Sequence, residues 1–81
     1  MDENSILARI DHLVGEEHRL RESVQKGTLT SDEERVRLRS LEEELDQCWD
    51  LLRRRRAARD NHQDPEAVDP RPVPEVESYL Q

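Results

Sequence analysis

The chain has few of the residues that build large cores or covalent frameworks. Its 81 residues include no phenylalanine, one tryptophan, one tyrosine, two glycines and one cysteine, and 41% of them are charged. A single cysteine, Cys48, excludes an internal disulfide framework and fits a reducing cytoplasm. No apolar run approaches the ~20 residues of a membrane span, and the acidic start MDENSILARI lacks the pattern of a secretory signal. We therefore expect a cytoplasmic protein that does not enter a membrane.

Apolar residues recur at heptad spacing in two segments. In the first segment they step by four, three, seven and four: Ile6, Ile10, Leu13, Leu20 and Val24. In the second they step by three, four, three and four: Leu38, Leu41, Leu45, Cys48 and Leu52. This is the a/d spacing of a coiled-coil seam. It predicts an all-α protein with one helix over about residues 3–26 and a second over about 31–60.

The residues between the two segments predict a turn at 27–30. Gly27 stands where many helices end in the left-handed conformation, which glycine adopts without a steric penalty. Thr30 and Ser31 are both good N-cap residues for the second helix. A connection this short favours antiparallel neighbours, so we expect residues 1–60 to form a helical hairpin.

Pairing the two seams about this turn sets a register. It places Ile6 near Leu52, and it brings the acidic start of the chain next to the arginines at 53–56. Glu17 takes a seam position that lacks an apolar side chain. We expect it to lean outward and pair with Arg37 or Arg39 of the second helix.

Residues 61–81 form a Pro-rich tail. All four prolines lie within ten residues, which excludes a continuing helix and favours an extended or polyproline conformation. The last residues differ, because some of them fall on one side of a short turn: Val73, Val76, Tyr79 and Leu80. The sequence leaves open whether the tail docks on the hairpin, binds another protein as a linear motif, or is a disordered end.

A lone hairpin of this size needs further cover for its apolar surface. Domains below about 70–80 residues seldom supply more than ~3–5 kcal/mol from their own core. Further apolar residues lie beside the two seams: Leu7, Val14, Val36, Trp49 and Leu51. Trp49 is the largest, and we interpret it as an interface anchor. We expect a homodimer that forms a four-helix bundle, with docking of the tail over Trp49 as the alternative; both can hold at once.

Side chains with catalytic or metal-binding chemistry are few. His12 and Glu16 share a helix face, but zinc sites use three or four ligands and the HExxH arrangement is absent. Cys48 occupies a seam position, where we expect a buried apolar role rather than a reactive thiol. We predict no enzyme activity, no cofactor and no metal. A metal-responsive protein acting through His12 and Glu16 is the weakest alternative.

The block RRRRAAR at 53–59 stands out, since it holds five arginines and no acid in a chain of net charge −7. Such a block can bind phosphate anions, and its candidate interaction residues are Arg53, Arg54, Arg55, Arg56 and Arg59. The competing interpretation is a helix C-terminus that complements the helix dipole and pairs with acids of its own chain: Asp2, Glu3, Asp60 and Asp64. An isoelectric point near 4.9 and the lack of interleaved aromatics weigh against nucleic acid. We favour pairing within the chain, then an acidic protein partner, then nucleic acid.

Four segments together resemble a known family: ILARIDHLVGEEHRL, GTLTSDEE, LEEELDQCWDLLRRRRA and VESYLQ. The family is a group of small actinobacterial proteins catalogued as a conserved domain of unknown function. The resemblance implies a cytoplasmic helical protein, supplies no active site to carry over, and indicates an ordered ending at Tyr79, Leu80 and Gln81. We predict a non-enzymatic interaction or scaffold protein that uses Trp49, Tyr79 and Leu80. The alternative is an anion-binding accessory factor, for the ribosome or nucleic acid, that uses Arg53 to Arg59.

Overall fold

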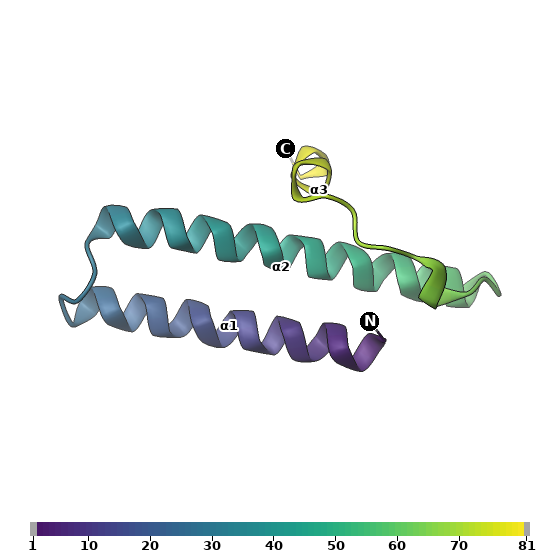
Figure 1. Ribbon diagram of the computed structural model, residues 1–81, viewed down its shortest axis with the longest axis horizontal. Coiled ribbons are helices and arrows are strands. Elements are labelled where there is room, and N and C mark those ends of the chain that lie inside the picture. Colours follow the sequence, from purple (N-terminus) through teal and green to yellow (C-terminus); the bar gives the residue numbers. More distant parts are fainter. Residues whose placement is uncertain (1, 81) are drawn as a thin grey trace.

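The computed structural model describes residues 2–80. In chain order its elements are helices α1 (Glu3–Gln25) and α2 (Ser31–Asp60), the 3-10 helix η1 (Pro65–Ala67) and helix α3 (Val73–Tyr79). No strand occurs within residues 2–80, so the chain is all-α there. Figure 1 shows α1 and α2 side by side and antiparallel, joined by a short turn. None of these helices combines the length and apolarity that a membrane span requires.

Local side-chain and backbone chemistry sets the ends of both long helices. The Asp2 carboxylate accepts a hydrogen bond from the Ser5 N–H at 2.8 Å, which caps α1. The Thr30 hydroxyl accepts one from the Glu33 N–H at 3.1 Å, which caps α2. Gly27 has φ +76°, the left-handed conformation predicted for this position.

The core lies at the end of the hairpin far from the turn. Its buried cluster consists of Ile6, Ile10, Leu51 and Leu52, and the partly buried residues packed against it are Leu7, Leu45, Cys48 and Val68. Ile6 and Leu52 thus belong to one cluster, in agreement with the predicted register. We expected Leu51 to remain outside the seam and to await a partner. Instead it is only 3% exposed, because the tail brings Val68 against the same cluster.

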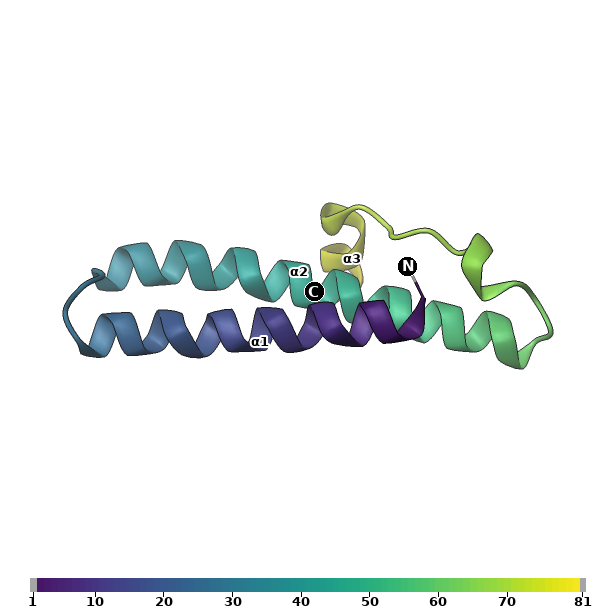
Figure 2. The same cartoon turned by 60° about the horizontal axis from the view of Figure 1, so that its bottom comes forward.

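The half of the hairpin next to the turn (residues 16–42, the turn half) is packed more thinly. No residue of α2 between 31 and 49 is buried, and the seam residues Leu38 and Leu41 are only half-buried. Leu20 of α1 is buried. Figures 1 and 2 show the reason, since α3 lies over a later part of α2 and the turn end consists of two helices alone.

The tail (residues 61–80) turns back along α2 after that helix ends. His62 takes φ +59°, and the Gln63 N–H donates to the Ala58 carbonyl at 2.7 Å. Both η1 and α3 then pack on α2. In Figure 1, α3 lies on the side of α2 away from α1. The tail is thus not extended throughout, because a Pro-led 3-10 turn and a two-turn helix interrupt it.

One predicted contact is wrong. Glu17 does not reach Arg37 or Arg39 across the hairpin, because its carboxylate pairs with Arg21 of the same helix at 3.0 Å. A partner four residues along the same helix is already adjacent, so this pair forms without bridging the two helices.

Candidate functional site

The most elaborate polar site in the molecule joins the tail to α2 through Asp50 and Arg71. Arg71 donates from Nε to Asp50 Oδ2 at 3.1 Å and from Nη2 to Oδ1 at 2.5 Å, a two-pronged pair. Arg71 Nη1 also donates to the Tyr79 hydroxyl at 3.1 Å, and the guanidinium lies 4.7 Å from the centre of that ring. The hydrogen bonds from Arg71 to Asp50 lower the pKa of Asp50 against the opposing effect of its burial. The site therefore holds a charged carboxylate under the tail.

Three further side chains of α2 donate hydrogen bonds to the backbone of the tail. Gln47 Nε2 donates to the carbonyl of Arg71 at 2.8 Å. Arg54 Nη1 donates to the carbonyl of Asp69 at 3.0 Å, and Arg55 Nε donates to that of Val68 at 3.2 Å. We call Gln47, Asp50, Arg54 and Arg55 the tail clamp, because together they fix the path of the chain from 68 to 71.

The rest of the arginine block pairs mainly with the start of α1. Arg56 Nε lies 2.6 Å from Glu3 Oε1, and Arg59 Nη1 lies 3.9 Å from Glu3 Oε2. The hydrogen bond from Arg56 lowers the pKa of Glu3. The block thus ties α1, α2 and the tail to one another.

Two of the other acids expected to pair with the block, Asp2 and Asp64, cap helices instead. Arg55 Nη1 lies 3.6 Å from Glu66 of η1, which was not among the expected partners. The Asp64 carboxylate caps η1 by accepting from the Glu66 N–H at 3.0 Å. Asp2 caps α1, and its pKa is lowered first by its bond to Ser5 and to a smaller extent by the charge of Arg55. Arg53 is exposed.

Helix α3 is held by one buried side chain and carries one unfavourable contact. Val76 is 2% exposed and is the apolar anchor of α3 on α2. Next to it, hydrogen bonding with the Asp46 carboxyl group and burial raise the pKa of Glu77, and the charges of Asp46 and Glu43 add to the effect. Two carboxyl groups in contact favour sharing one proton, so this contact weakens when both ionise.

The three apolar residues proposed for interaction all remain at the surface. Trp49 is 42% exposed, so neither α1 nor the tail buries it. Tyr79 and Leu80 are also exposed, although the Tyr79 hydroxyl belongs to the site around Arg71. Their role in binding stays a prediction.

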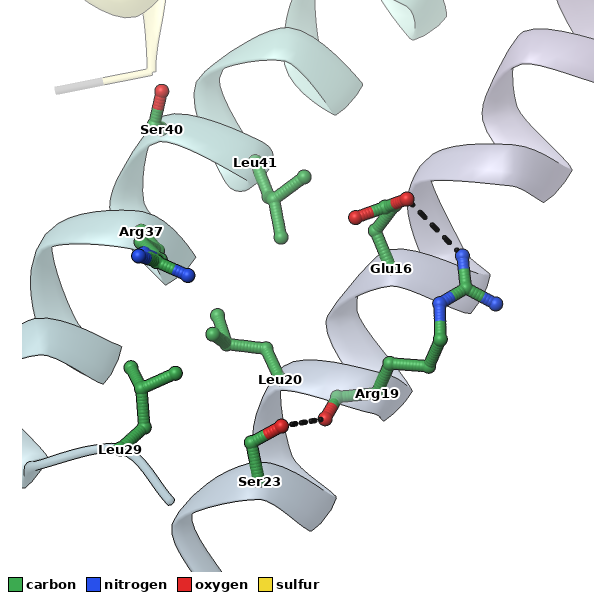
Figure 3. Close-up of a pocket in the computed structure, with 8 residues that line it drawn as sticks. All are labelled: Glu16, Arg19, Leu20, Ser23, Leu29, Arg37, Ser40 and Leu41. Atoms are coloured by element: carbon green, nitrogen blue, oxygen red, sulfur yellow. Dashed lines mark hydrogen bonds and ion pairs between the residues drawn. The ribbon is translucent and has the colours of Figure 1, made fainter.

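A groove of about 470 Å³ opens between α1 and α2 in the turn half. Its apolar floor is formed by Leu20, Leu29 and Leu41, which point toward one another in Figure 3. Polar side chains from both helices form its rim: Glu16, Arg19, Ser23, Arg37 and Ser40. Arg19 pairs with Glu16 at 3.2 Å on the α1 side of the rim.

His12 and Glu16, which were considered for metal binding, lie on α1, and Cys48, which was considered for thiol chemistry, lies beside the core. His12 Nε2 lies 3.5 Å from Glu16 Oε1 on the exposed surface of α1. Within residues 2–80, no cluster of three or more His, Cys, Asp or Glu side chains is placed to hold a metal ion. Cys48 is half-buried beside the core, and burial raises the pKa of its thiol, which keeps it protonated at neutral pH.

The pairing of Asp50 with Arg71 was missed at the level of the sequence, although signals for it exist. Arg71 is the one basic residue among the acids of residues 60–81, and Asp50 interrupts the apolar stretch CWDLL. A carboxylate in an apolar stretch indicates that Asp50 has a basic partner, but the sequence does not indicate that this partner is Arg71.

The sequence profile of the family described as "Protein of unknown function (DUF2630)" matches residues 2–81. The chain belongs to this family. This membership, together with similar proteins from Mycobacterium, confirms the predicted resemblance to actinobacterial proteins of unknown function. The chain is 47% identical over 77 residues to Uncharacterized protein Mb0922c of Mycobacterium bovis and to Uncharacterized protein Rv0898c of Mycobacterium tuberculosis. Each alignment covers 95% of this chain and 88% of the relative. No solved structure matches the chain significantly.

Proposed function

We propose that this DUF2630 protein is a non-enzymatic interaction or scaffold protein that works as a homodimer, with the helices of two hairpins forming a four-helix bundle. The observation that carries the proposal is the open turn half. Its seam residues Leu38 and Leu41 are half-buried, whereas Leu52 at the other end of the same seam is 1% exposed. A helix pair with a thin seam gains stability when another helix pair covers it.

The total surface supports the same conclusion. The chain exposes 5804 Å². A compact monomer of this mass exposes about 5,100 Å², so roughly 700 Å² is in excess. A standard protein interface covers about 800 Å² on each partner, which is close to this excess. The Cα radius of gyration of 15.1 Å likewise exceeds the ~12 Å of a compact domain of 81 residues.

The surroundings of the reactive side chains support a non-enzymatic role. A thiol nucleophile needs a lowered pKa and a neighbouring base, whereas burial raises the pKa of Cys48. His12 lies on the exposed surface of α1, with its Nε2 3.5 Å from Glu16 Oε1. A cytoplasmic location remains part of the proposal and rests on the low cysteine content.

Anion or nucleic-acid binding through Arg53 to Arg59 is the alternative, and the contacts weigh against it. Arg54 and Arg55 bind the tail, while Arg56 and Arg59 pair with Glu3. An anion would have to compete with partners that the fold already supplies. An acidic protein partner faces the same competition.

Sedimentation velocity and light scattering after size exclusion test the dimer between about 1 and 200 µM. We expect a mass of twice the 9.6 kDa chain at the upper concentrations. A 9.6 kDa species throughout the range would contradict self-association. A fluorescence anisotropy titration with labelled RNA at two salt concentrations tests the alternative, which predicts binding that weakens as salt rises.

A further inference from the structure

We propose that the groove floored by Leu20, Leu29 and Leu41 is the face through which a second copy of this chain docks. The inference rests on the self-association proposed above and assigns it to one of two flanks of the hairpin. The groove holds about 470 Å³ between α1 and α2, with its leucines converging on the hollow (Figure 3). Apolar side chains of a partner helix fill such a space.

The groove lies on one flank of α2, and the tail covers the same flank further along the helix. Residues seven apart in a heptad pattern share one flank of a helix. On α2 this flank carries Arg37, Glu44, Leu51 and Ala58. Leu51 and Ala58 are buried in the half of α2 on which the tail docks, whereas Arg37 lines the open groove. The flank is thus continuous, and the chain itself covers only one half of it.

The charges on the rim permit a copy of the same surface to approach. A two-fold interface brings a patch against itself, so a patch of one sign repels its copy. The groove carries both signs, with Arg19 and Arg37 beside Glu16. This matters because the chain as a whole has a net charge of −7, which opposes self-association at surfaces dominated by acids.

The area also favours a second copy. The excess surface of roughly 700 Å² is close to the ~800 Å² that each partner of a standard interface buries. A groove on the turn half allows a partner hairpin to lie along the bare ends of α1 and α2. The tail, which docks further along α2, remains in place (Figure 2).

The competing face is the opposite flank, which carries Trp49 and Val14. Both are about two-fifths exposed, at 42% and 40%. In the heptad pattern each follows the seam residue directly, at Cys48 and Leu13, and so lies on the flank away from Arg37. If the dimer forms through the groove, a charge placed in the groove weakens it. If the dimer forms through the flank of Trp49, a charge placed on that flank weakens it instead.

Two matched variants separate them. Ser40→Arg places a long charged side chain on the rim of the groove, at an exposed position that leaves the leucines intact. Val14→Arg does the same on the opposite flank. For Ser40→Arg we expect the dimer dissociation constant to rise by at least about tenfold, since a buried unpaired charge is costly at an interface. For Val14→Arg we expect a change below about threefold, because an exposed site has no such cost. Circular dichroism checks that both variants retain helix.

The outcomes are distinct. Loss of the dimer in Val14→Arg but not in Ser40→Arg, or an equal effect in both or in neither, overturns the groove as the interface and leaves the dimer standing. A wild-type chain that is monomeric at all concentrations overturns the proposed function as well.

A second measurement uses labelling in place of disruption. In a Cys48→Ser background, Ser40→Cys provides a single thiol on the rim. We expect its rate of modification by a maleimide to fall at least about fivefold between 1 and 200 µM protein, as a two-fold interface covers the groove. Val14→Cys in the same background is the control, with a rate that does not change. Equal rates for Ser40→Cys at both concentrations contradict the inference even if the arginine variant fails to fold.

Discussion

Val76 offers a direct measure of how firmly the tail is docked. It is 2% exposed, and it anchors α3 on α2. Val76→Ala removes two buried methyl groups. At ~0.8 kcal/mol for each buried carbon, with a further cost for the space left behind, the loss of unfolding free energy is about 2 kcal/mol. For a domain of this length that loss corresponds to a fall in Tm of about 8–16 °C.

A second valine provides the control. Val36 is 71% exposed on α2, so Val36→Ala removes the same two carbons from a surface position. Both changes replace a β-branched residue in a helix by alanine and share the same small gain in helix propensity. We expect Val36→Ala to change stability by no more than about 0.5 kcal/mol. The difference between the two variants therefore isolates the burial of Val76.

Urea denaturation followed by circular dichroism at 222 nm is the suitable assay, because its midpoint and slope report stability and exposed area separately. The loss in Val76→Ala cannot exceed the free energy that docks the tail, since the tail detaches once docking becomes unfavourable. A value well below 2 kcal/mol with a reduced slope would therefore give the docking free energy itself. If Val76→Ala costs no more than Val36→Ala, with an unchanged slope, α3 is not docked on α2 and the reasoning is refuted.

Three further predictions concern single positions. Glu77→Gln should raise the Tm at pH 7.5 but not at pH 4. Docking raises the pKa of Glu77, so the protonated side chain supports docking fully below the ordinary pKa of 4.5. That support is lost as the pH rises through the raised pKa. Thermal melts across this range check it, and a Tm difference that does not vary with pH would contradict the contact with Asp46. Gly27→Ala should lower the free energy of unfolding by about 1 kcal/mol, because a side chain is unfavourable at its φ of +76°. Gly15→Ala in mid-helix should raise the free energy of unfolding by roughly 0.5–1 kcal/mol. Urea melts that show the same sign for both changes would exclude this assignment of the turn. His62→Gly should raise the free energy of unfolding by up to about 1 kcal/mol, since φ is +59° at this residue. A loss of stability in urea melts would show that the His62 side chain stabilises the fold by more than its backbone strain costs.

The hairpin could be predicted because its determinants are local. The heptad steps define the seam, and Gly27 and Thr30 act within one turn of their own positions. The burial of Leu51 could not be predicted in this way. A heptad pattern describes how one helix faces another, and Leu51 is covered by a third segment whose path the pattern does not contain.

The tail was harder to predict because its contacts are long-range. Arg71 lies 21 residues from Asp50 in sequence, and their meeting depends on the reversal of the chain at residues 61–64. Proline content indicated an extended segment, which is correct for the stretch between η1 and α3 alone. Trp49 shows the same limit. Cover by the tail was the alternative to cover by a partner chain, and the tail leaves Trp49 42% exposed, because it follows the flank of Leu51.

The backbone contacts of the tail clamp have a consequence for the sequence of the tail. Gln47, Arg54 and Arg55 bind peptide carbonyls, which every amino acid carries. Helix α2 therefore holds residues 68–71 largely by their backbone, whatever side chains they carry. Side-chain identity in the tail matters at fewer points: the Arg71 guanidinium on Asp50, the Glu66 carboxylate near Arg55, and the buried Val76.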